Sequence, residues 1–380
     1  EFLVKEIEEL SSLERVIGLA EVMDFLAVIN GEDRMMDIID FMDKKGLYLQ
    51  GHAPYVSGRM LSAYLCGGPN TCHETRDSDE ALEKIRNGMF VDARDSSITK
   101  NVKEVYEGVK GIKFFDHLCF CTDDREADDI LHVGHLNDVV RAAISYGMDP
   151  VTAIKSATYN TAREIHIENL GAIAPGYVAD MLLVDSLEEL KPAKVFFGGK
   201  LVAENGQLVA EIEDRSYPLE HKNTMFVKDL TVEDFKIKAP VQEGTVKVNA
   251  MEYKDLLLSS TLQTVLELPV RDGCVQLTDD TLKYVAVVNR HEGHDTIGLG
   301  IVKGFGTTCG ALASTVSHDS HNLTIVYDTP ENALKAAQAL IACGGGMSAV
   351  KDGELLHVLE LPLAGLISLK PAKELAKDSQ

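Results

Sequence analysis

The sequence predicts an α/β protein: an incomplete TIM-like (β/α)8 barrel, then a small β domain and a C-terminal α+β domain. Two observations predict this class. From residue 17 to about residue 123, short apolar stretches alternate with amphipathic stretches of helical period, which is typical of repeated strand and helix units. From Leu170 the pattern changes to apolar residues that alternate with polar residues or glycine, which indicates hairpins.

Five parallel strands are expected in the first part of the chain, because each apolar stretch is short and ends in polar residues. They span residues 17–22, 47–52, 69–74, 89–95 and 117–124. Helices between and after the strands have visible start signals, chiefly side chains that cap an N-terminus. They begin at Gly31, after Ser57, after Asp77 or Ser78, at Thr99, at Gly134, and at Asp149 followed by Pro150.

Three domains follow from these changes in pattern. Residues 1–165 form the barrel part, and residues 166–225 form the small β domain. Residues 226–380 form an α+β domain, with strands from about Gly244 and a helix that begins near Pro330. The stretch 217–250, which contains proline, charge and short strands, is typical of a boundary between domains.

Composition excludes several classes of partner. The formal charge of −23 and the pI near 4.9 repel phosphate backbones and anionic membrane faces, so no nucleic-acid or membrane partner is expected. No apolar run approaches the roughly 20 residues that span a bilayer, and the N-terminus lacks a signal-peptide pattern. The sequence therefore predicts a soluble, cytoplasmic protein.

The seven cysteines are an odd number and lack a paired CxxC spacing, which predicts reduced thiols. Cys119 and Cys121 alternate within one predicted strand and point the same way. We expect them to be small residues of the barrel lining.

Polar residues stand at the ends of the five predicted strands: Glu21, His52, His73, Arg94 and Asp123. Their separations of 31, 21, 21 and 29 residues each match one strand, one helix and two loops. In a (β/α)8 barrel such residues converge on the C-terminal rim, where active sites are built. Two imidazoles and two carboxylates on one rim predict a divalent metal site.

These same stretches resemble the adenine deaminases of the amidohydrolase superfamily. The motifs are GLAEVMDF with Glu21, GHAPYVSG with His52, NTCHE with His73, FCTDD with Asp123, and LGAIAPGYVADMLLVD. In the last domain, GLGIVKGFG and ASTVSHDSHN resemble that family's own C-terminal domain. The resemblance covers essentially all 380 residues. It implies a metal-dependent hydrolase barrel, of which this chain carries strands 4 to 8.

The resemblance also implies an activity and a role for each residue. Glu21 would bridge a binuclear divalent metal centre of manganese or iron, with zinc as a further option. His52 and His73 would bind one ion, and Asp123 would bind the other and act as the base. The reaction would be the hydrolytic deamination of adenine to hypoxanthine and ammonia, as in purine salvage. Two cations would help by lowering the pKa of a water molecule between them.

The chain departs from the family pattern at three places. No pair of its twelve histidines has the H-x-H spacing that the family places on its first barrel strand. Cys72 stands where the family often has aspartate, and Tyr55 where it commonly has glycine. We therefore expect that an N-terminal segment, needed to complete the barrel and the second half of the metal site, is missing. A homo-oligomer is a further possibility at this stage.

Further residues are candidates for substrate binding: Arg94, Ser317, His318, Asp319 and His321. Arg94 could hold the substrate, or it could pair with Asp123 or a neighbouring carboxylate. The SHDSHN stretch could be a tight turn whose side chains bond to the backbone, or a contact that closes over the purine.

Two other functions stay open from the sequence. The first is a non-catalytic or incomplete amidohydrolase-fold module that lacks one metal half-site. The second is another hydrolase of cyclic amides or amidines that shares the metal site. Release of ammonia from adenine, and not from other rings, would separate these alternatives from adenine deamination.

Overall fold

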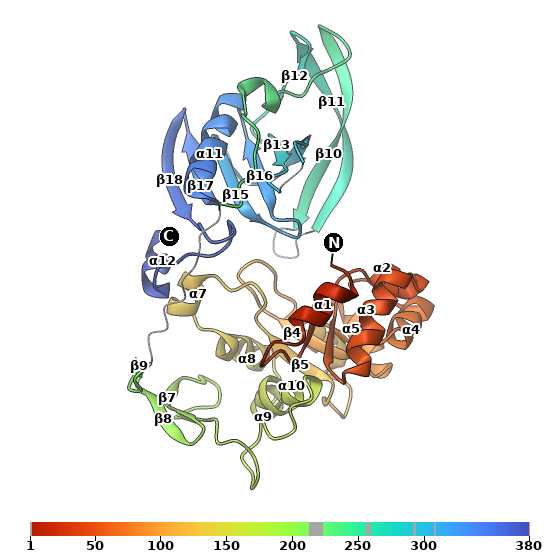
Figure 1. Ribbon diagram of the computed structural model, residues 1–380, viewed down its shortest axis with the longest axis vertical. Helices are drawn as coiled ribbons and strands as arrows, with labels where there is room; N and C mark the ends of the chain where they lie inside the picture. The colour runs from red at the N-terminus through yellow and green to blue at the C-terminus, as the bar shows by residue number, and fades with distance from the viewer. Residues whose placement is uncertain (1, 213–222, 256–259, 292–293, 308, 380) are drawn as a thin grey trace. The chain divides into compact units, whose positions relative to one another are not determined.

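The structure is a computed structural model that describes residues 2–212, 223–255, 260–291, 294–307 and 309–379 (Figure 1). Contacts within the chain divide it into two compact units, Glu1–Asp214 and Arg215–Gln380. Each unit has its own hydrophobic core. Among the described residues, none of the helices combines the length and the apolar character that a membrane span requires.

Five parallel strands form the centre of the first unit. They are β1 (Gly18–Val22), β2 (Tyr48–Gly51), β3 (Thr71–Cys72), β4 (Phe90–Arg94) and β5 (Leu118–Cys121). Strand β1 pairs with β2, and β3, β4 and β5 form a second sheet in that order. Each observed strand lies within the range predicted for it. The α/β character of this part is therefore confirmed.

Helices separate these strands along the chain, as parallel pairing requires. They are α1 (Val4–Leu10), α2 (Phe25–Asn30), α3 (Asp33–Lys44), α4 (Gly58–Cys66), α5 (Ser78–Arg86), α6 (Val102–Val109), α7 (Ala127–His132) and α8 (Leu136–Ser145). The sequence did not predict α1, α2 and α7, which have seven, six and six residues. Apolar residues on one side of each longer helix pack into two core clusters against the strands.

Capping side chains fix several of these helix starts. Asp77 accepts a hydrogen bond from the Glu80 backbone N–H at 2.9 Å, which confirms it as the N-cap of α5. Ser57 occupies the N-cap position of α4 as predicted, but its side chain makes no capping bond. The Gly58 backbone N–H there donates instead to the Glu83 carboxylate of α5, at 2.8 Å.

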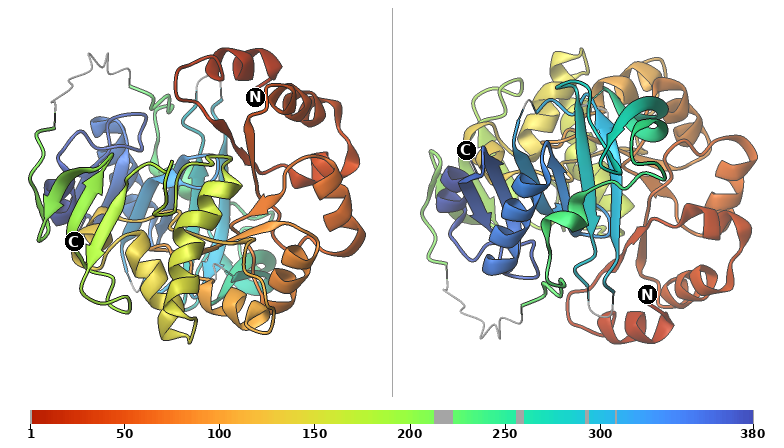
Figure 2. Two further views of the ribbon diagram at one scale, coloured as in Figure 1. Left: turned by 90° about the horizontal axis from the view of Figure 1, so that it is seen from below. Right: turned by 90° about the horizontal axis from the view of Figure 1, so that it is seen from above.

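The last helical stretch of this unit contains a π-helical turn. Helix α9 (Pro150–Lys155) begins after the N-cap Asp149, continues as a π segment (Ser156–Asn160) and ends as α10 (Thr161–Glu164). Helix α8 packs against α9, as the yellow helices of Figure 2 show. Within the π segment, Asn160 donates to the carbonyls of Phe115 and Leu118, which ties it to β5.

A four-stranded antiparallel sheet follows in the same unit. Its strands are β6 (Met181–Val184), β7 (Pro192–Phe197), β8 (Lys200–Glu204) and β9 (Gln207–Leu208), paired in sequence order. The hairpins predicted for this stretch are therefore confirmed. The division of the chain into three domains at residues 165 and 225 stays a prediction.

The second unit is built on a nine-stranded sheet in the order β12-β11-β10-β14-β13-β16-β15-β17-β18. Its strands are β10 (Gly244–Asp255), β11 (Ser260–Arg271), β12 (Cys274–Val275), β13 (Leu282–Val288), β14 (Ile297–Lys303), β15 (Ala311–Ser317), β16 (Asn322–Tyr327), β17 (Gly346–Lys351) and β18 (Glu354–Glu360). Only the pair β10 and β14 is parallel among the described pairings.

One long helix packs on this sheet, α11 (Pro330–Cys343), next to β15, β16 and β17 (Figure 1). Thr329 caps its N-terminus and Pro330 takes its first position. Gly344 ends it with a φ of 86°, a left-handed conformation that glycine adopts without strain. A short 3-10 turn, η2 (Val232–Phe235), and the helix α12 (Ala372–Asp378) complete the unit. The predicted α+β character of this part is confirmed.

Candidate metal centre

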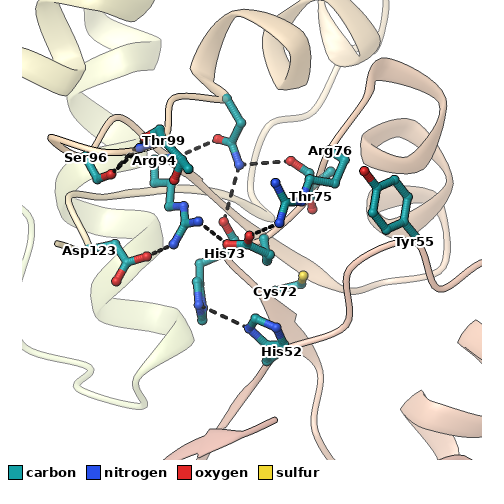
Figure 3. A network of polar contacts seen from close by, with 12 residues as sticks. His52, Tyr55, Cys72, His73, Thr75, Arg76, Arg94, Ser96, Thr99 and Asp123 are labelled. Atoms are coloured by element: carbon teal, nitrogen blue, oxygen red, sulfur yellow. Dashed lines mark hydrogen bonds and ion pairs between the residues drawn. The ribbon is translucent and has the colours of Figure 1, made fainter. Parts of the chain in front are cut away.

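Three side chains at the carboxyl ends of β1, β2 and β3 meet in the first unit. Glu21 lies within β1, His52 follows β2 directly, and His73 follows β3 directly. The Glu21 Oε2 lies 2.9 Å from the His73 Nε2, and its Oε1 lies 3.7 Å from the His52 Nδ1. The two imidazole nitrogens lie 3.4 Å apart (Figure 3). These three residues can therefore present one ligand atom each to a shared point.

Burial and nearby charges favour the protonation states of these groups that bind a metal ion. Burial lowers the pKa of His52, which favours the neutral imidazole that a metal ion requires. Burial alone raises the pKa of Glu21, but the hydrogen bond from His73 and the nearby charges outweigh it. The pKa of Glu21 is therefore below its ordinary value, and this side chain is a carboxylate at neutral pH.

A second group of charged residues adjoins the first. Arg94, the last residue of β4, forms ion pairs with Glu74 and with Asp123, which follows β5 by two residues. Glu74 also pairs with Arg76, so carboxylates and guanidinium groups alternate in a chain of ion pairs. Figure 3 shows the end of this chain at Arg94 and Asp123. The backbone of Asp123 has a φ of 50°, a left-handed conformation that aspartate tolerates better than most residues.

His73 belongs to both groups. Its ring offers a ligand atom close to those of Glu21 and His52, and also close to those of Glu74 and Asp123. Within each of these two sets, the ligand atoms lie within 4.8 Å of one another. The structure thus brings together the four residues that the sequence singled out as metal ligands.

The spacing of the first set fits a bound divalent ion. Imidazole and carboxylate ligands lie about 2.0–2.2 Å from zinc and similar ions, so neighbouring ligand atoms are separated by roughly 3.0–3.4 Å. The His73 Nε2 lies 2.9 Å from the Glu21 Oε2 and 3.4 Å from the His52 Nδ1, close to the two ends of that range, and the 3.7 Å contact of His52 is made to the other oxygen of Glu21. Two nitrogens and a carboxylate suit zinc, iron and manganese alike.

Sequence reasoning missed one residue that fixes this geometry, Asn101. Its side-chain carbonyl accepts from the Arg94 backbone N–H at 2.8 Å. Its amide donates to the backbone carbonyls of His73 and Thr75, at 3.3 and 2.9 Å. Asn101 therefore joins the end of β3 to the end of β4. An asparagine seven residues after Arg94 offers no sequence signal for this role.

The remaining candidates lie in the second unit: Ser317 is the last residue of β15, and His318, Asp319 and His321 form the turn between β15 and β16. The His321 backbone N–H donates to the Ser317 carbonyl at 2.7 Å, and the His318 and His321 rings meet edge to face. The stretch therefore forms a tight turn closed by a backbone-to-backbone hydrogen bond, and the side-chain bonds to the backbone expected for it stay a prediction. Substrate contact by these residues stays a prediction.

A cluster of buried polar side chains lies on the same strands as the metal centre, two residues before the strand ends. Gln50 precedes His52 by two residues and donates to Asp92, which precedes Arg94 by two residues. Glu164 from α10 accepts a hydrogen bond from Tyr48, and its carboxylate approaches those of Asp92 and the thiol of Cys119. Burial raises the pKa of Asp92 well above its ordinary value, and the charge of Glu164 adds to this effect.

The Asp92→Asn variant should therefore be more stable than the unmodified protein at pH 8. Because the pKa of Asp92 is raised in the folded state, this group contributes its full stability to the fold below its unfolded pKa of 3.8. That stability is lost as pH rises through the raised pKa. Asparagine removes this loss, so its advantage in unfolding free energy should grow from pH 5 to pH 8. Urea unfolding followed by circular dichroism at pH 5, 6.5 and 8 measures it.

Asp138→Asn is the matched control, because its pKa is shifted in the opposite direction. Burial alone raises the pKa of Asp138, but hydrogen bonds and charges from Arg125 and Arg141 bring it below its ordinary value. Asp138 therefore stabilises the fold above its unfolded pKa, and its replacement should destabilise at pH 8. A less stable Asp92→Asn protein at pH 8 would contradict the argument.

Comparison with known families agrees with the two units. Residues 3–202 match the amidohydrolase family, and residues 259–380 match the adenine deaminase C-terminal domain. The first match contains all four predicted metal ligands. The second contains the turn between β15 and β16.

Curated relatives align with nearly the whole chain. It is 36% identical to the adenine deaminase of Kosmotoga olearia over 96% of this chain and 62% of that protein. It is 36% identical to adenine deaminase 2 of Carboxydothermus hydrogenoformans, over 98% of this chain and 64% of that protein. It is 39% identical to the adenine deaminase of Bacillus velezensis, over 94% and 62%. The chain spans slightly less than two thirds of these relatives.

Proposed function

The chain belongs to the amidohydrolase family, and from this premise we propose that the protein hydrolyses adenine to hypoxanthine and ammonia at a divalent metal centre. The observation that carries the proposal is the meeting of Glu21, His52 and Asp123 around His73. The substrate is inferred from the names of the relatives and from the adenine deaminase C-terminal domain match.

We assign the metal centre to these four side chains. His52 and His73 would hold one ion through neutral ring nitrogens, and the Glu21 carboxylate would contribute to this ion and to a second one. Asp123 would bind the second ion. Manganese and iron are the proposed metals, with zinc as a further option. When bound, the ions act as Lewis acids that lower the pKa of a water molecule.

The chemistry then requires a base beside the attacking water. Asp123 lies at the rim with a carboxylate that can take the proton of water as its oxygen adds to C6 of adenine. The same carboxyl group returns a proton to the amino group, which leaves as ammonia. The C6–N bond breaks and a C6–O bond forms, so no oxidant or reductant is needed.

Arg94 would hold Asp123 in place for this step. Its guanidinium group pairs with Asp123 on one side and with Glu74 on the other, and it is 8% exposed. A planar, permanently charged group between two carboxylates restricts the rotamers of both. The pairing is one of the alternatives that the sequence left open for Arg94, and contact of Arg94 with the substrate stays a prediction.

Other features remain predictions. A second ion needs ligands beyond Glu21 and Asp123, and we propose that a further segment supplies them together with the remaining barrel strands. We also propose a cytoplasmic location and a homo-oligomer.

An assay of the protein, as its gene encodes it, tests the function. We expect release of ammonia and formation of hypoxanthine from adenine in the presence of Mn²⁺, and loss of both after chelation. Cyclic amides such as dihydroorotate should not react. Turnover of such a ring in place of adenine would favour another amidohydrolase activity, and absence of any turnover would contradict the proposal.

A further inference from the structure

A buried ion pair on α5 contacts the loops that carry His52 and His73. Its two residues are outside the set of proposed ligands. Lys84 and Glu80 stand one turn apart on α5, with their charged atoms 2.5 Å from each other. Their side chains are 0% and 6% exposed. An i,i+4 pair of this kind usually lies in solvent on a helix surface. Here both charges are removed from water and need compensation from the protein.

The ammonium group of Lys84 reaches the residue next to each histidine. Its Nζ donates to the backbone carbonyl of Ala53 at 2.7 Å, and Ala53 directly follows His52. It also lies 3.2 Å from the Sγ of Cys72, which directly precedes His73, and 3.4 Å from the hydroxyl of Thr75. One side chain thus holds the ends of β2 and β3 together.

Glu80 also bonds to both loops, at residues further along the chain. Its Oε1 accepts from the backbone N–H of Tyr55, and its Oε2 accepts from that of Arg76, both at 2.9 Å. Tyr55 and Arg76 each lie three residues after a histidine. The two charged groups of α5 therefore make five contacts, with the loop after β2, with the end of β3 and with the loop after it.

An apolar pair of similar size would avoid the desolvation of two charges and often gives equal or greater stability. What apolar side chains lack is the set of directed hydrogen bonds to two separate loops. We propose that the Lys84–Glu80 pair is a clamp that sets the separation of His52 and His73 for one divalent cation. The inference rests on the proposed function, and it assigns positioning residues to the same site.

The clamp predicts a loss of metal affinity in the Lys84→Met/Glu80→Gln double variant. Glutamine keeps the shape of Glu80 and one acceptor, and no unpaired charge remains, whereas methionine removes every bond from Nζ. We expect the dissociation constant for Mn²⁺ to rise about 10-fold to 100-fold, the usual effect of losing a partner that orients a ligand. Titration with Mn²⁺ alone, followed by the electron paramagnetic resonance signal of the free ion, measures this constant.

Val140→Ala is the control for a merely structural effect. Val140 is a buried residue of α8, away from both histidine loops, so its truncation destabilises the same unit through a cavity. We expect it to leave the Mn²⁺ dissociation constant within about twofold, because the loops keep their hydrogen bonds. Urea titration measures the loss of unfolding free energy in each variant. The Mn²⁺ dissociation constants of the variants are then compared against that loss.

A second variant, Lys84→Gln/Glu80→Gln, replaces the ion pair by a neutral polar pair in case the methionine prevents folding. Glutamine at position 84 is shorter than lysine, so this variant should also bind Mn²⁺ more weakly, by a smaller factor than the methionine variant. Unchanged affinity in a folded double variant would overturn the clamp and leave the metal site intact. Failure of the unmodified protein to bind Mn²⁺ would overturn the proposed metal site and the clamp with it.

Discussion

The Asp123→Asn variant should turn over adenine at least about 10²-fold more slowly than the unmodified protein, with metal still bound. Asparagine keeps an oxygen ligand but cannot accept a proton at neutral pH, and loss of a general base typically lowers the rate 10²-fold to 10⁴-fold. Steady-state release of ammonia at saturating adenine, with Mn²⁺ content measured on the same sample, checks both parts of this expectation.

The backbone at this position accommodates asparagine as well as aspartate. Asp123 has a φ of 50°, and asparagine adopts the left-handed region at least as readily as aspartate does. The ion pair between Asp123 and Arg94 becomes a hydrogen bond to the amide oxygen, so Arg94 keeps a partner. The loss of rate can therefore be read as a chemical effect and not as local unfolding.

Asp124→Asn is the matched control, since it makes the same change one residue later. Asp124 is exposed, and the sequence favours a capping or solvated role for it. We expect turnover within about twofold of the unmodified protein, as is usual for a surface substitution. Equal rates for both variants, at equal metal content, would refute the assignment of Asp123 as the base.

The strand ends were predictable from sequence because two simple rules act together there. Short apolar stretches that end in polar residues mark buried parallel strands, and parallel strands deliver their carboxyl ends to one edge. Glu21, His52 and His73 follow both rules, and their side chains meet. The resemblance to a known family then supplied the distinction between ligand and base, which spacing alone does not provide.

Two kinds of feature were beyond this reasoning. Helices α1, α2 and α7 have seven, six and six residues, too few to show a helical period. The π turn at Ser156–Asn160 looks like ordinary helix in sequence. Partners that are distant along the chain are equally hidden. Tyr48 and Glu164, for instance, are separated by 116 residues.

The Lys84–Glu80 pair shows how a local rule can mislead. Its i,i+4 spacing predicts a solvated pair on a helix surface, which is the commoner case. Burial of the pair follows from the packing of α5 beside the loops after β2 and β3, and that packing is set by the whole fold. The same applies to Asn101, whose three partners lie at two strand ends.

The His73→Ala variant should lose more Mn²⁺ affinity than the His52→Ala variant. His73 takes part in both ligand groups, whereas His52 takes part in the first only. Its ring also accounts for the shortest of the first-group contacts, 2.9 Å to Glu21. Removing a direct ligand should raise the Mn²⁺ dissociation constant by more than roughly 100-fold, which is the upper end of the effect of losing an outer partner.

Titration of free Mn²⁺ by electron paramagnetic resonance would compare His73→Ala, His52→Ala and the control His132→Ala. His132 is an exposed residue of α7 whose ring bonds to the carbonyl of Asp128, so its loss should leave the dissociation constant unchanged. His52→Ala should lower metal occupancy less than His73→Ala, because Glu21, Glu74 and Asp123 still surround an intact His73. Full Mn²⁺ affinity in His73→Ala would mean that the ion, if bound, lies elsewhere, and the proposed centre would have to be abandoned.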